Sequence, residues 1–548
     1  MLSYRKLAMR VLGRPLHTGG SDSPRPASQR AAALILTAAM LTTLTAPAFA
    51  KEWYIEEGDI TVRAGETEGT NKVSQGENPE VEDTNTVITN SDKDKASSNT
   101  VTIEAKDKDN KVEVTLKDVN IDASSRSEAA VSVTGEGNTN IELDGDNALK
   151  SGIYSSGISS SGSLTISGGE NDSLTAQGGS GADGIYSSGS LTISGGTVTA
   201  NGGSGADGGD GGDGIWSSGG VTISGGSTVT ANGGDGKDDY GGDGICSDSG
   251  DVTISGGSTV TANGGNSGNV SGDGIRSGGG VTISGGTVNA AGGDSKDGYG
   301  GDGIRSGGGV TISGNTVNAA GGNGGKVGGY GICSFARVSI SGGTVNAAGG
   351  NGKNSNGGDG IRSGGIDLSG SLELTAKAGK PNGKALSRAG SELDLDDIKD
   401  KLDPGAKVTA TDANGETKQV SIPRPVEPEK PVIPEESSSS SDGGSATPSA
   451  PASPLPGLTV TDKDGQRISY TSTQSGNTLT VCVGRLTASL RASLATLHQL
   501  RAEGIDTITF QTILCSTTLS VDELLAMGGE DAEAVLTHRL TASSLTVG

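Results

Sequence analysis

A column of acidic residues recurs through the middle of the chain, each directly before a Gly-Ile pair. Its members are Asp183, Asp213, Asp243, Asp273, Asp302 and Asp359. Carboxylate oxygens are ligands that calcium prefers, and the stretches ending at Asp183 and Asp213 match the calcium-binding pattern Gly-Gly-x-Gly-x-Asp. The pattern predicts calcium at these aspartates. The alternative is that each carboxylate accepts hydrogen bonds from turn amides, as in an Asx-turn.

A second column stands one residue after the isoleucine of each Gly-Ile pair. It consists of Tyr154, Tyr186, Trp216, Cys246, Arg276, Arg305, Cys333 and Arg362. If the isoleucines point inward, these side chains point outward, and flat rings beside guanidinium groups suit the faces and carboxylates of a sugar chain. The predicted glycan-binding residues are therefore Tyr154, Tyr186, Trp216, Arg276, Arg305 and Arg362. The alternative is a ladder that only stabilises neighbouring strands.

Catalysis is not expected in this region. The chain has 3 histidines, and none of them lies between residues 151 and 375, which removes Ser-His-Asp and Cys-His arrangements there. Paired carboxylates can form glycosidase sites, but here the acidic residues recur in register and form no single cluster that interrupts the repeat. We expect a protein that is not an enzyme, with a β-helix polysaccharide lyase or glycosidase as the less favoured alternative.

Three short apolar segments, repeated about every 30 residues, must position both columns. The first is Gly-Ile-x-Ser, with isoleucines Ile153, Ile185, Ile215, Ile245, Ile275, Ile304, Ile332 and Ile361. The second is Val/Leu-Thr-Ile-Ser-Gly, and the third is Thr-Val-(Thr/Asn)-Ala followed by glycines. A fixed period of this size marks a solenoid. Three strands per unit, joined by glycine turns and without helical periodicity, predict an all-β solenoid of the parallel β-helix kind.

Composition fits a narrow solenoid better than a compact globular domain. Of 548 residues, 96 are glycine, 31% are hydrophobic and 2% are aromatic. Low hydrophobicity with a net charge of −24 also describes disordered chains, but periodic isoleucine and valine argue against disorder over 150–375. The acidic balance argues against a nucleic-acid partner, because phosphate binding needs a basic surface.

The N-terminus has the pattern of an export signal. Basic residues precede an apolar run from Ala31 to Ala46, and Ala48-Phe49-Ala50 is a small-x-small cleavage site. Residues 1–50 are therefore a predicted signal peptide, with a retained membrane anchor as the alternative. No second apolar span follows, so we expect a secreted or cell-surface protein that is not integral to a membrane after cleavage.

The remaining boundaries follow changes in composition. Strand-like stretches in 51–150 predict irregular coils that cap the solenoid, with a separate β-sandwich as the alternative. The regular repeats cover 151–375, the C-terminal end of the solenoid 376–421, and a flexible Pro/Ser-rich linker 422–457.

A small α/β domain of unknown function is predicted for 458–548. Its leucines predict a helix that stops at Gly504, and they are Leu486, Leu490, Leu494, Leu497 and Leu500. Cys482 and Cys515 lie in this region and could pair. Cys246 and Cys333 stand three units apart, too far to bridge.

The order of the motifs resembles the clostridial cell-surface carbohydrate-binding β-helix family over about 100–375. The resemblance is carried by Lys111–Asp122, Ala129–Val133, Asn140–Leu143, Ser151–Tyr154, Leu164–Gly168 and the later Asp-Gly-Ile motifs. It implies a right-handed parallel β-helix on exported proteins, binding to acidic plant polysaccharides, and calcium ions in the fold. By the same resemblance, the aspartates of the Asp-Gly-Ile motifs are the calcium positions.

The expected function is that of an exported bacterial surface protein which binds polysaccharide along one face of its β-helix. The alternative is a structural or adhesin-like stalk that presents the C-terminal domain. A host or cell-surface protein as ligand would suit that alternative equally well.

Overall fold

The computed structural model describes residues 51–423, apart from 68, 107–110 and 207, and residues 458–547 with short gaps at 463–465, 469, 476, 484–486, 503, 513–515, 522–523, 526–532 and 540–541. The chain forms two compact units, Met1–Pro425 and Val426–Gly548. The predicted signal peptide and nearly all of the predicted linker lie outside the described residues.

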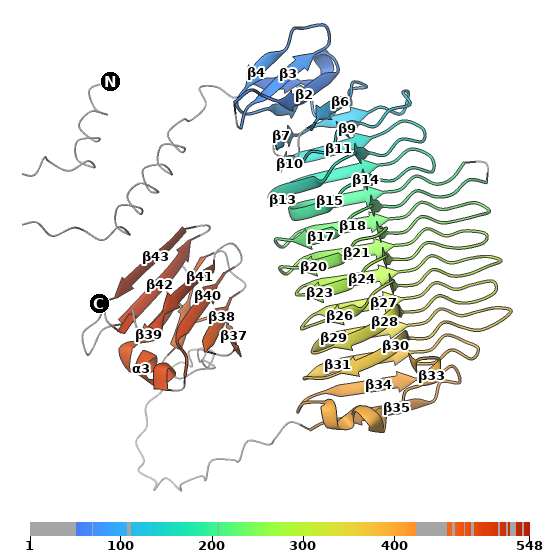
Figure 1. The fold of residues 1–548 in the computed structure, drawn as a ribbon, viewed down its shortest axis with the longest axis vertical. Helices are drawn as coiled ribbons and strands as arrows, with labels where there is room; N and C mark the ends of the chain where they lie inside the picture. Colours follow the sequence, from blue (N-terminus) through green and yellow to red (C-terminus); the bar gives the residue numbers. More distant parts are fainter. Residues whose placement is uncertain are drawn as a thin grey trace, which may run out of the picture. The chain divides into compact units, whose positions relative to one another are not determined.

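The first unit is a parallel β-helix, as the repeat predicts (Figure 1). Its 35 strands, β1 to β35, are joined by hydrogen bonds, and each regular coil contributes one short strand to each of three faces. Corresponding strands of successive coils pair in parallel, for example Ile215 with Ile245 and Ile245 with Ile275. Repeat positions therefore become straight columns along the solenoid.

The first face carries the Gly-Ile-x-Ser segments. Its strands are β2 (Ile60–Ala64), β6 (Val101–Glu104), β9 (Val131–Thr134), β12 (Ile158–Ser160), β14 (Ile185–Ser187), β16 (Ile215–Ser217), β19 (Ile245–Ser247), β22 (Ile275–Ser277), β25 (Ile304–Ser306), the first parts of β28 (Ile332–Ile340) and β30 (Ile361–Leu368), and β32 (Leu386–Arg388).

The second face carries the Val/Leu-Thr-Ile-Ser segments. Its strands are β1 (Glu52–Tyr54), β5 (Val87–Thr89), β7 (Val112–Lys117), β10 (Thr139–Asp144), the first parts of β13 (Leu164–Gln177) and β15 (Leu191–Asn201), β17 (Val221–Ser224), β20 (Val252–Ser255), β23 (Val281–Ser284), β26 (Val310–Ile312), and the last parts of β28 and β30.

The third face carries the Thr-Val-(Thr/Asn)-Ala segments. Its strands are β8 (Asn120–Asp122), β11 (Asp146–Lys150), the last parts of β13 and β15, β18 (Thr228–Asn232), β21 (Thr259–Asn263), β24 (Thr287–Ala291), β27 (Thr316–Ala320), β29 (Gly343–Ala348), β31 (Leu372–Lys377) and β34 (Lys407–Thr411).

Both ends of the solenoid are covered. At the N-terminal end, η1 (Ile55–Glu57) follows β1, and β3 (Asn71–Gln75) and β4 (Val81–Asp83) pair antiparallel beside β2. At the C-terminal end, β33 (Ser391–Glu392) pairs antiparallel with β32, η2 (Leu395–Lys401) precedes β34, and β35 (Thr417–Ser421) pairs antiparallel with β34. Residues 51–150 thus continue the solenoid instead of forming a separate sandwich.

The interior is a set of aliphatic columns. Val221 and Ile223 are fully buried while Thr222 between them faces outward, as period-two alternation requires. The serine of each Gly-Ile-x-Ser segment also points inward. From Ser187 to Ser363 its hydroxyl donates to a backbone carbonyl of the preceding coil, as in Ser217 Oγ to Gly189 O at 2.8 Å. This bond satisfies a polar group that burial would otherwise make costly.

The first regular coil starts at Ile158 and not at Ile153, so that assignment was wrong. Ile158 pairs with Ile185, whereas Ile153 is 56% exposed in a turn. Gly152-Ile153 and Gly157-Ile158 both fit the motif, but only Ile158 stands six residues before the second segment at Leu164, the same interval as from Ile185 to Leu191. That interval decides the register, because the two segments are five to seven residues apart in every later coil, as from Ile361 to Ile366 and from Ile245 to Val252.

The Gly-rich segments form stacked loops that project from the solenoid (Figure 1). The outgoing and returning segments of these loops form backbone hydrogen bonds both within one coil and between neighbouring coils. Within a coil, Gly242 N donates to Gly234 O; between coils, Gly234 N donates to Gly212 O. A Cβ at Gly272 would lie 1.8 Å from Gly242 O. Such close approach of two backbones explains why these loops consist so largely of glycine.

The second unit contains two four-stranded sheets. One consists of β36 (Leu458–Thr461), β39 (Thr487–Ser493), β42 (Glu533–Arg539) and β43 (Ala542–Val547); the other consists of β37 (Thr471–Ser475), β38 (Thr478–Cys482), β40 (Thr507–Gln511) and β41 (Ser516–Ser520). Helix α3 (Leu494–Ala502) follows β39. The unit has its own apolar core, which includes Phe510 and Leu497.

The predicted helix in this unit was wrong over its first part. Leu490 lies in β39, where Ala488, Leu490 and Ala492 alternate inward with period two. The leucine spacing alone could not show this, because small alanines supply the other inward positions of the strand. Cys482 is a free thiol, and its possible partner Cys515 lies outside the described residues. No helix in the described part of the chain is both long and apolar enough to cross a bilayer.

Candidate functional site

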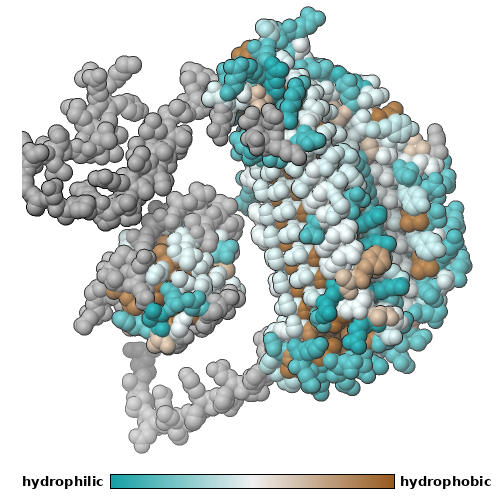
Figure 2. Space-filling model, in the orientation of Figure 1, coloured by the Kyte–Doolittle hydropathy of each residue, from teal (hydrophilic) through white to brown (hydrophobic). Residues whose placement is uncertain are grey.

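A groove of about 800 Å³ runs along the solenoid between the first face and the glycine loops. Three columns of residues line it. The floor is the acidic column, with Asp213, Asp243, Asp273, Asp302 and, in the same register, Tyr330. One wall is the outward column, with Trp216, Cys246, Arg276 and Arg305. The other wall comes from the loops and consists of Tyr240, Val270, Tyr299 and Val327. On the face shown in Figure 2, the outer edge of the loops is largely hydrophilic with some hydrophobic patches, and the surface over the stacked strands is mostly pale with a hydrophobic stripe.

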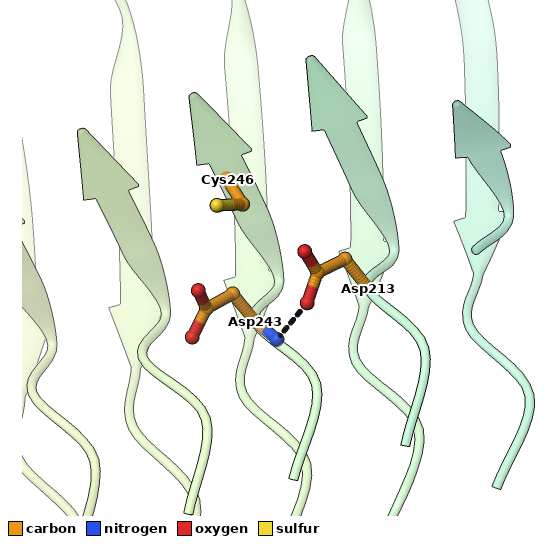
Figure 3. Close-up of side chains that lie close together, drawn as sticks. All are labelled: Asp213, Asp243 and Cys246. Carbon is orange, nitrogen blue, oxygen red and sulfur yellow. Dashed lines mark hydrogen bonds between the residues drawn. The ribbon is translucent and has the colours of Figure 1, made fainter. Parts of the chain in front are cut away.

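The floor aspartates are linked from coil to coil through the backbone. Oδ1 of Asp213 accepts the amide of Asp243 at 2.5 Å (Figure 3). Oδ1 of Asp243 in turn accepts the amide of Asp273 at 2.6 Å. The same bond joins Asp183 to Asp213 at 2.7 Å and Asp302 to the amide of Tyr330 at 2.7 Å. Each aspartate thus supports the turn of the next coil, which is the hydrogen-bonding role given above as the alternative to calcium.

Burial makes the charged form of these aspartates costly. Desolvation raises the pKa of Asp183 and of Asp302 to about 6. Desolvation, and then the neighbouring carboxylates, raise the pKa of Asp213 and Asp273 well above the ordinary value. The pKa of Asp243 is also raised by desolvation, although the Arg276 guanidinium opposes the shift. Carboxylates stacked about 5 Å apart repel each other, so the column favours protons or bound cations.

Two arginines of the outward column lie beside these carboxylates. Nη1 of Arg276 is 3.6 Å from Oδ2 of Asp243, and Nη1 of Arg305 is 3.7 Å from Oδ2 of Asp302. Both distances exceed hydrogen-bond length, and Oδ2 of Asp302 is buried without a hydrogen bond. The guanidinium groups therefore compensate charge without saturating the second carboxylate oxygen.

The aromatic members of the outward column stack on each other. The rings of Tyr186 and Trp216 have centroids 4.7 Å apart and planes 4° apart. This contact is the strand-stabilising ladder given above as the alternative to sugar binding. Farther along, the Arg362 guanidinium lies 4.9 Å from the Tyr330 ring centroid and donates a hydrogen bond to its hydroxyl.

Tyr154 does not belong to the outward column, which corrects its assignment there. The residue beside Tyr186 is Ser159, while Tyr154 is 77% exposed in a turn with φ of 60°. Asp183, Tyr186, Asp359 and Arg362 continue the two columns beyond the residues that line the groove. The groove itself brings together the other predicted residues, which are Asp213, Asp243, Asp273, Asp302, Trp216, Arg276 and Arg305.

The loop wall was not predicted. Tyr240 pairs in register with Val270, Val270 with Tyr299, and Tyr299 with Val327, so these side chains form a further column. Each stands three residues before the floor position of its coil. That constant interval was a signal for the wall, and the variable lengths of the loops concealed it.

The residues present fit calcium poorly. Asp213, Asp243 and Cys246 place one ligand atom each within 4.8 Å of one another. Calcium takes six to eight oxygen ligands, a thiol is a soft ligand, and burial raises the pKa of the Cys246 thiol far above its usual range. Because one oxygen of each floor carboxylate is already bonded to an amide, we derive no function from calcium here. The sequence-based expectation of calcium stays a prediction.

Comparison with known families supports the fold. Residues 191–215, 221–245 and 281–304 match the beta helix repeat family. These segments run from the second face of one coil to the first face of the next, so they cover the loops as well as the strands. Comparison with curated proteins and with solved structures gives no match.

Proposed function

We propose that the solenoid is a glycan-binding module without enzymatic activity, which holds a polysaccharide in the groove of the first unit. The observation that carries the proposal is the groove's lining: an indole, tyrosine rings, guanidinium groups and carboxylates face one elongated space. Rings contact sugar faces, and the ionic groups hydrogen-bond to hydroxyls. Protein sites for small ligands combine apolar surface with a few polar groups in this way.

The acidic plant glycan implied by the family resemblance is one candidate within this proposal. Arg305, which lies farther along the groove, would bind a sugar carboxylate. Export to the cell surface is proposed on the pattern of residues 1–50 alone. The absence of enzymatic activity is proposed because the floor carboxylates recur in register and already accept backbone amides.

A glycan array and titration calorimetry with the full-length protein test the proposal. The expected result is binding of at least one polysaccharide, weakened about tenfold or more by Trp216→Ala or Arg305→Ala. Tyr154→Ala is the matched control, because this exposed tyrosine lies outside the columns. No binding to any glycan by a protein with an unchanged melting temperature would overturn the proposal.

A structural stalk is the second candidate. The stacked rings of Tyr186 and Trp216 and the amide bonds of the floor aspartates favour it, because both use the columns to hold coils together. The separate core of the second unit is compatible with a unit that such a stalk presents. If the glycan test is negative, binding assays on host and cell-surface proteins with the full-length chain test this candidate.

A further inference from the structure

The aromatic stack of the outward column ends at Trp216. Its centroid separation from Tyr186, 4.7 Å, equals the spacing of neighbouring strands, so the two rings lie one above the other along the solenoid axis. Tyr186 covers one face of the indole. The opposite face is turned toward the next coil, where Cys246 occupies the same register position.

Cys246 is too short to continue the stack. Its side chain is buried, and the next position of the column is Arg276. Two coil spacings, about 9 to 10 Å, separate Trp216 from Arg276 along the column. A ring needs about 4.5 Å from centroid to centroid on each side, so the spacing of the column suits one ring inserted over Cys246. The Arg276 guanidinium, which reaches back to within 3.6 Å of Asp243 on that coil, is the other boundary of the ring. We call the space bounded by Trp216, Cys246 and Arg276 the Cys246 subsite; all three residues line the groove.

The Cys246 subsite is surrounded by carboxylates. On the two coils that bear Trp216 and Cys246, the groove is lined by Asp210, Asp213, Asp243 and Asp248, and Arg276 from the following coil is the nearest guanidinium along the column. Arg276 approaches Asp243, whereas no ion pair of Asp213 is found within the described residues. Oδ1 of Asp213 accepts an amide, which leaves Oδ2 as an acceptor at the floor (Figure 3).

This arrangement favours a cation over an anion. An ammonium group at Asp213 would gain a charge-assisted hydrogen bond and would reduce the repulsion among Asp183, Asp213 and Asp243. A uronic acid at the same place would add another negative charge. The turn itself does not require a charge, because Asn266 and Asn323 accept the same kind of backbone bond elsewhere in the chain.

We propose that the Cys246 subsite binds one amino-sugar ring, stacked on the free face of Trp216 with its protonated amine on Asp213. The inference rests on the proposed function, because it names the sugar class for one part of the same groove. The ring supplies the stacking contact and the amine supplies the ionic contact, so a ligand with only one of the two binds more weakly.

Tryptophan fluorescence of the full-length protein tests this subsite. The chain has 2 tryptophans, and Trp53 is buried beside Asp83 at the N-terminal end, so Trp53→Phe leaves Trp216 as the only reporter. The probes are a glucosamine tetramer, an N-acetylglucosamine tetramer, a galacturonic acid tetramer and spermidine, each titrated at pH 6.5. We expect the glucosamine tetramer to bind at least tenfold more tightly than the other three.

Variants of the subsite separate stacking from charge. Cys246→Phe fills the space and abolishes the fluorescence change, while Cys246→Ser preserves it. Asp213→Asn keeps the backbone hydrogen bond and weakens glucosamine binding about tenfold or more, the loss expected for one charge-assisted bond.

Each outcome is decisive. Tighter binding of the acetylated or acidic tetramer, or an unchanged response in Cys246→Phe, would overturn the amino-sugar assignment and leave the proposed function standing. Spermidine binding as tight as the glucosamine tetramer would overturn the stacked ring. If no tetramer binds and the glycan array is also negative, both proposals fail together.

Discussion

Two ladders of side chains cap backbone amides along the same solenoid, and they differ in charge and burial. Near the loop tips, Oδ1 of each residue accepts the amide of the next coil at 2.6 to 2.9 Å, in the order Asp235, Asn266, Asp294, Asn323, Asn351. On the groove floor the same bond is made at 2.5 to 2.7 Å from Asp183 to Asp302, and there every acceptor is a carboxylate.

This difference shows which part of the floor ladder the fold requires, namely a hydrogen-bond acceptor, and which part it does not require, namely the negative charge. The exposed ladder uses aspartate and asparagine interchangeably, so a neutral acceptor is sufficient for the turn. The floor ladder keeps carboxylates where Asp243, Asp273 and Asp302 are almost fully buried, which costs stability. Under the proposed function, the floor charge would serve a ligand in the groove and not the solenoid.

The largest effect is expected from a substitution that disturbs both ladders at once. Gly272 lies between Asn266 of the tip ladder and Asp273 of the floor ladder, and an added Cβ would lie 1.8 Å from a carbonyl oxygen. Gly272→Ala should therefore destabilise the solenoid by about 3 kcal/mol, as overpacking does. Gly280→Ala, whose added Cβ has its nearest atom at 3.3 Å, is the control in thermal melts. Equal melting temperatures for the two variants would contradict the close packing of the loops.

The second largest effect is expected from removing the side-chain oxygen that accepts the amide of the next coil. Asp273→Ala and Asp273→Asn both remove the charge, but only asparagine can still accept the buried amide of Asp302. We expect the alanine variant to be less stable than the asparagine variant by about 1 to 3 kcal/mol. At the exposed ladder, Asn323→Ala should cost about 0.5 kcal/mol or less, because water replaces the acceptor. Denaturant melts with equal losses at both ladders would show that burial does not distinguish them.

The pH dependence of stability tests the charge itself. Burial raises the pKa of Asp183 and Asp302 to about 6, whereas unfolded aspartates titrate near 4. The folded chain therefore binds more protons than the unfolded chain between these values, and its stability falls as pH rises through 6.

We expect a melting temperature several degrees higher at pH 5.0 than at pH 7.5, and a smaller difference in Asp302→Asn. Asp294→Asn at the loop tip is the matched control. Carboxyl groups with a lowered pKa, such as the Arg126-bonded Asp59, change stability only below their unfolded pKa and therefore contribute little between pH 5.0 and 7.5. A melting temperature that rises from pH 5.0 to 7.5 would contradict the account of the floor.

The smallest expected effect is that of a chelator. Because the floor oxygens already accept amides and a thiol is among the nearest ligands, we expect EDTA to leave the melting temperature within about one degree. A magnesium-saturated chelator is the control for ionic strength. A fall of several degrees that added calcium reverses would establish the ions that the family resemblance implies.

Much of the fold could be predicted because residues at the same position of each repeat have the same burial and the same neighbours. Alternation in Val221-Thr222-Ile223 determines which side chains are buried, and parallel stacking turns a periodic residue into a column. The register at Ile153 could not be read from the motif alone, since Gly157-Ile158 fits it equally well. The loop wall of Tyr240 and Tyr299 and the Tyr186–Trp216 stack depend on how loops and rings pack across coils, which residue types do not specify.

The melting temperature of Asp273→Asn at pH 7.5 tests directly whether the buried floor charge costs the solenoid stability. Asp273 is buried between like charges, and burial together with Asp302 and Asp243 raises its pKa well above the ordinary value. We predict that Asp273→Asn melts at a higher temperature than the wild-type chain, while Asp294→Asn at the loop tip changes little. A melting temperature several degrees below that of the wild-type chain would show that the solenoid needs this carboxylate, and would contradict a floor charge that costs stability.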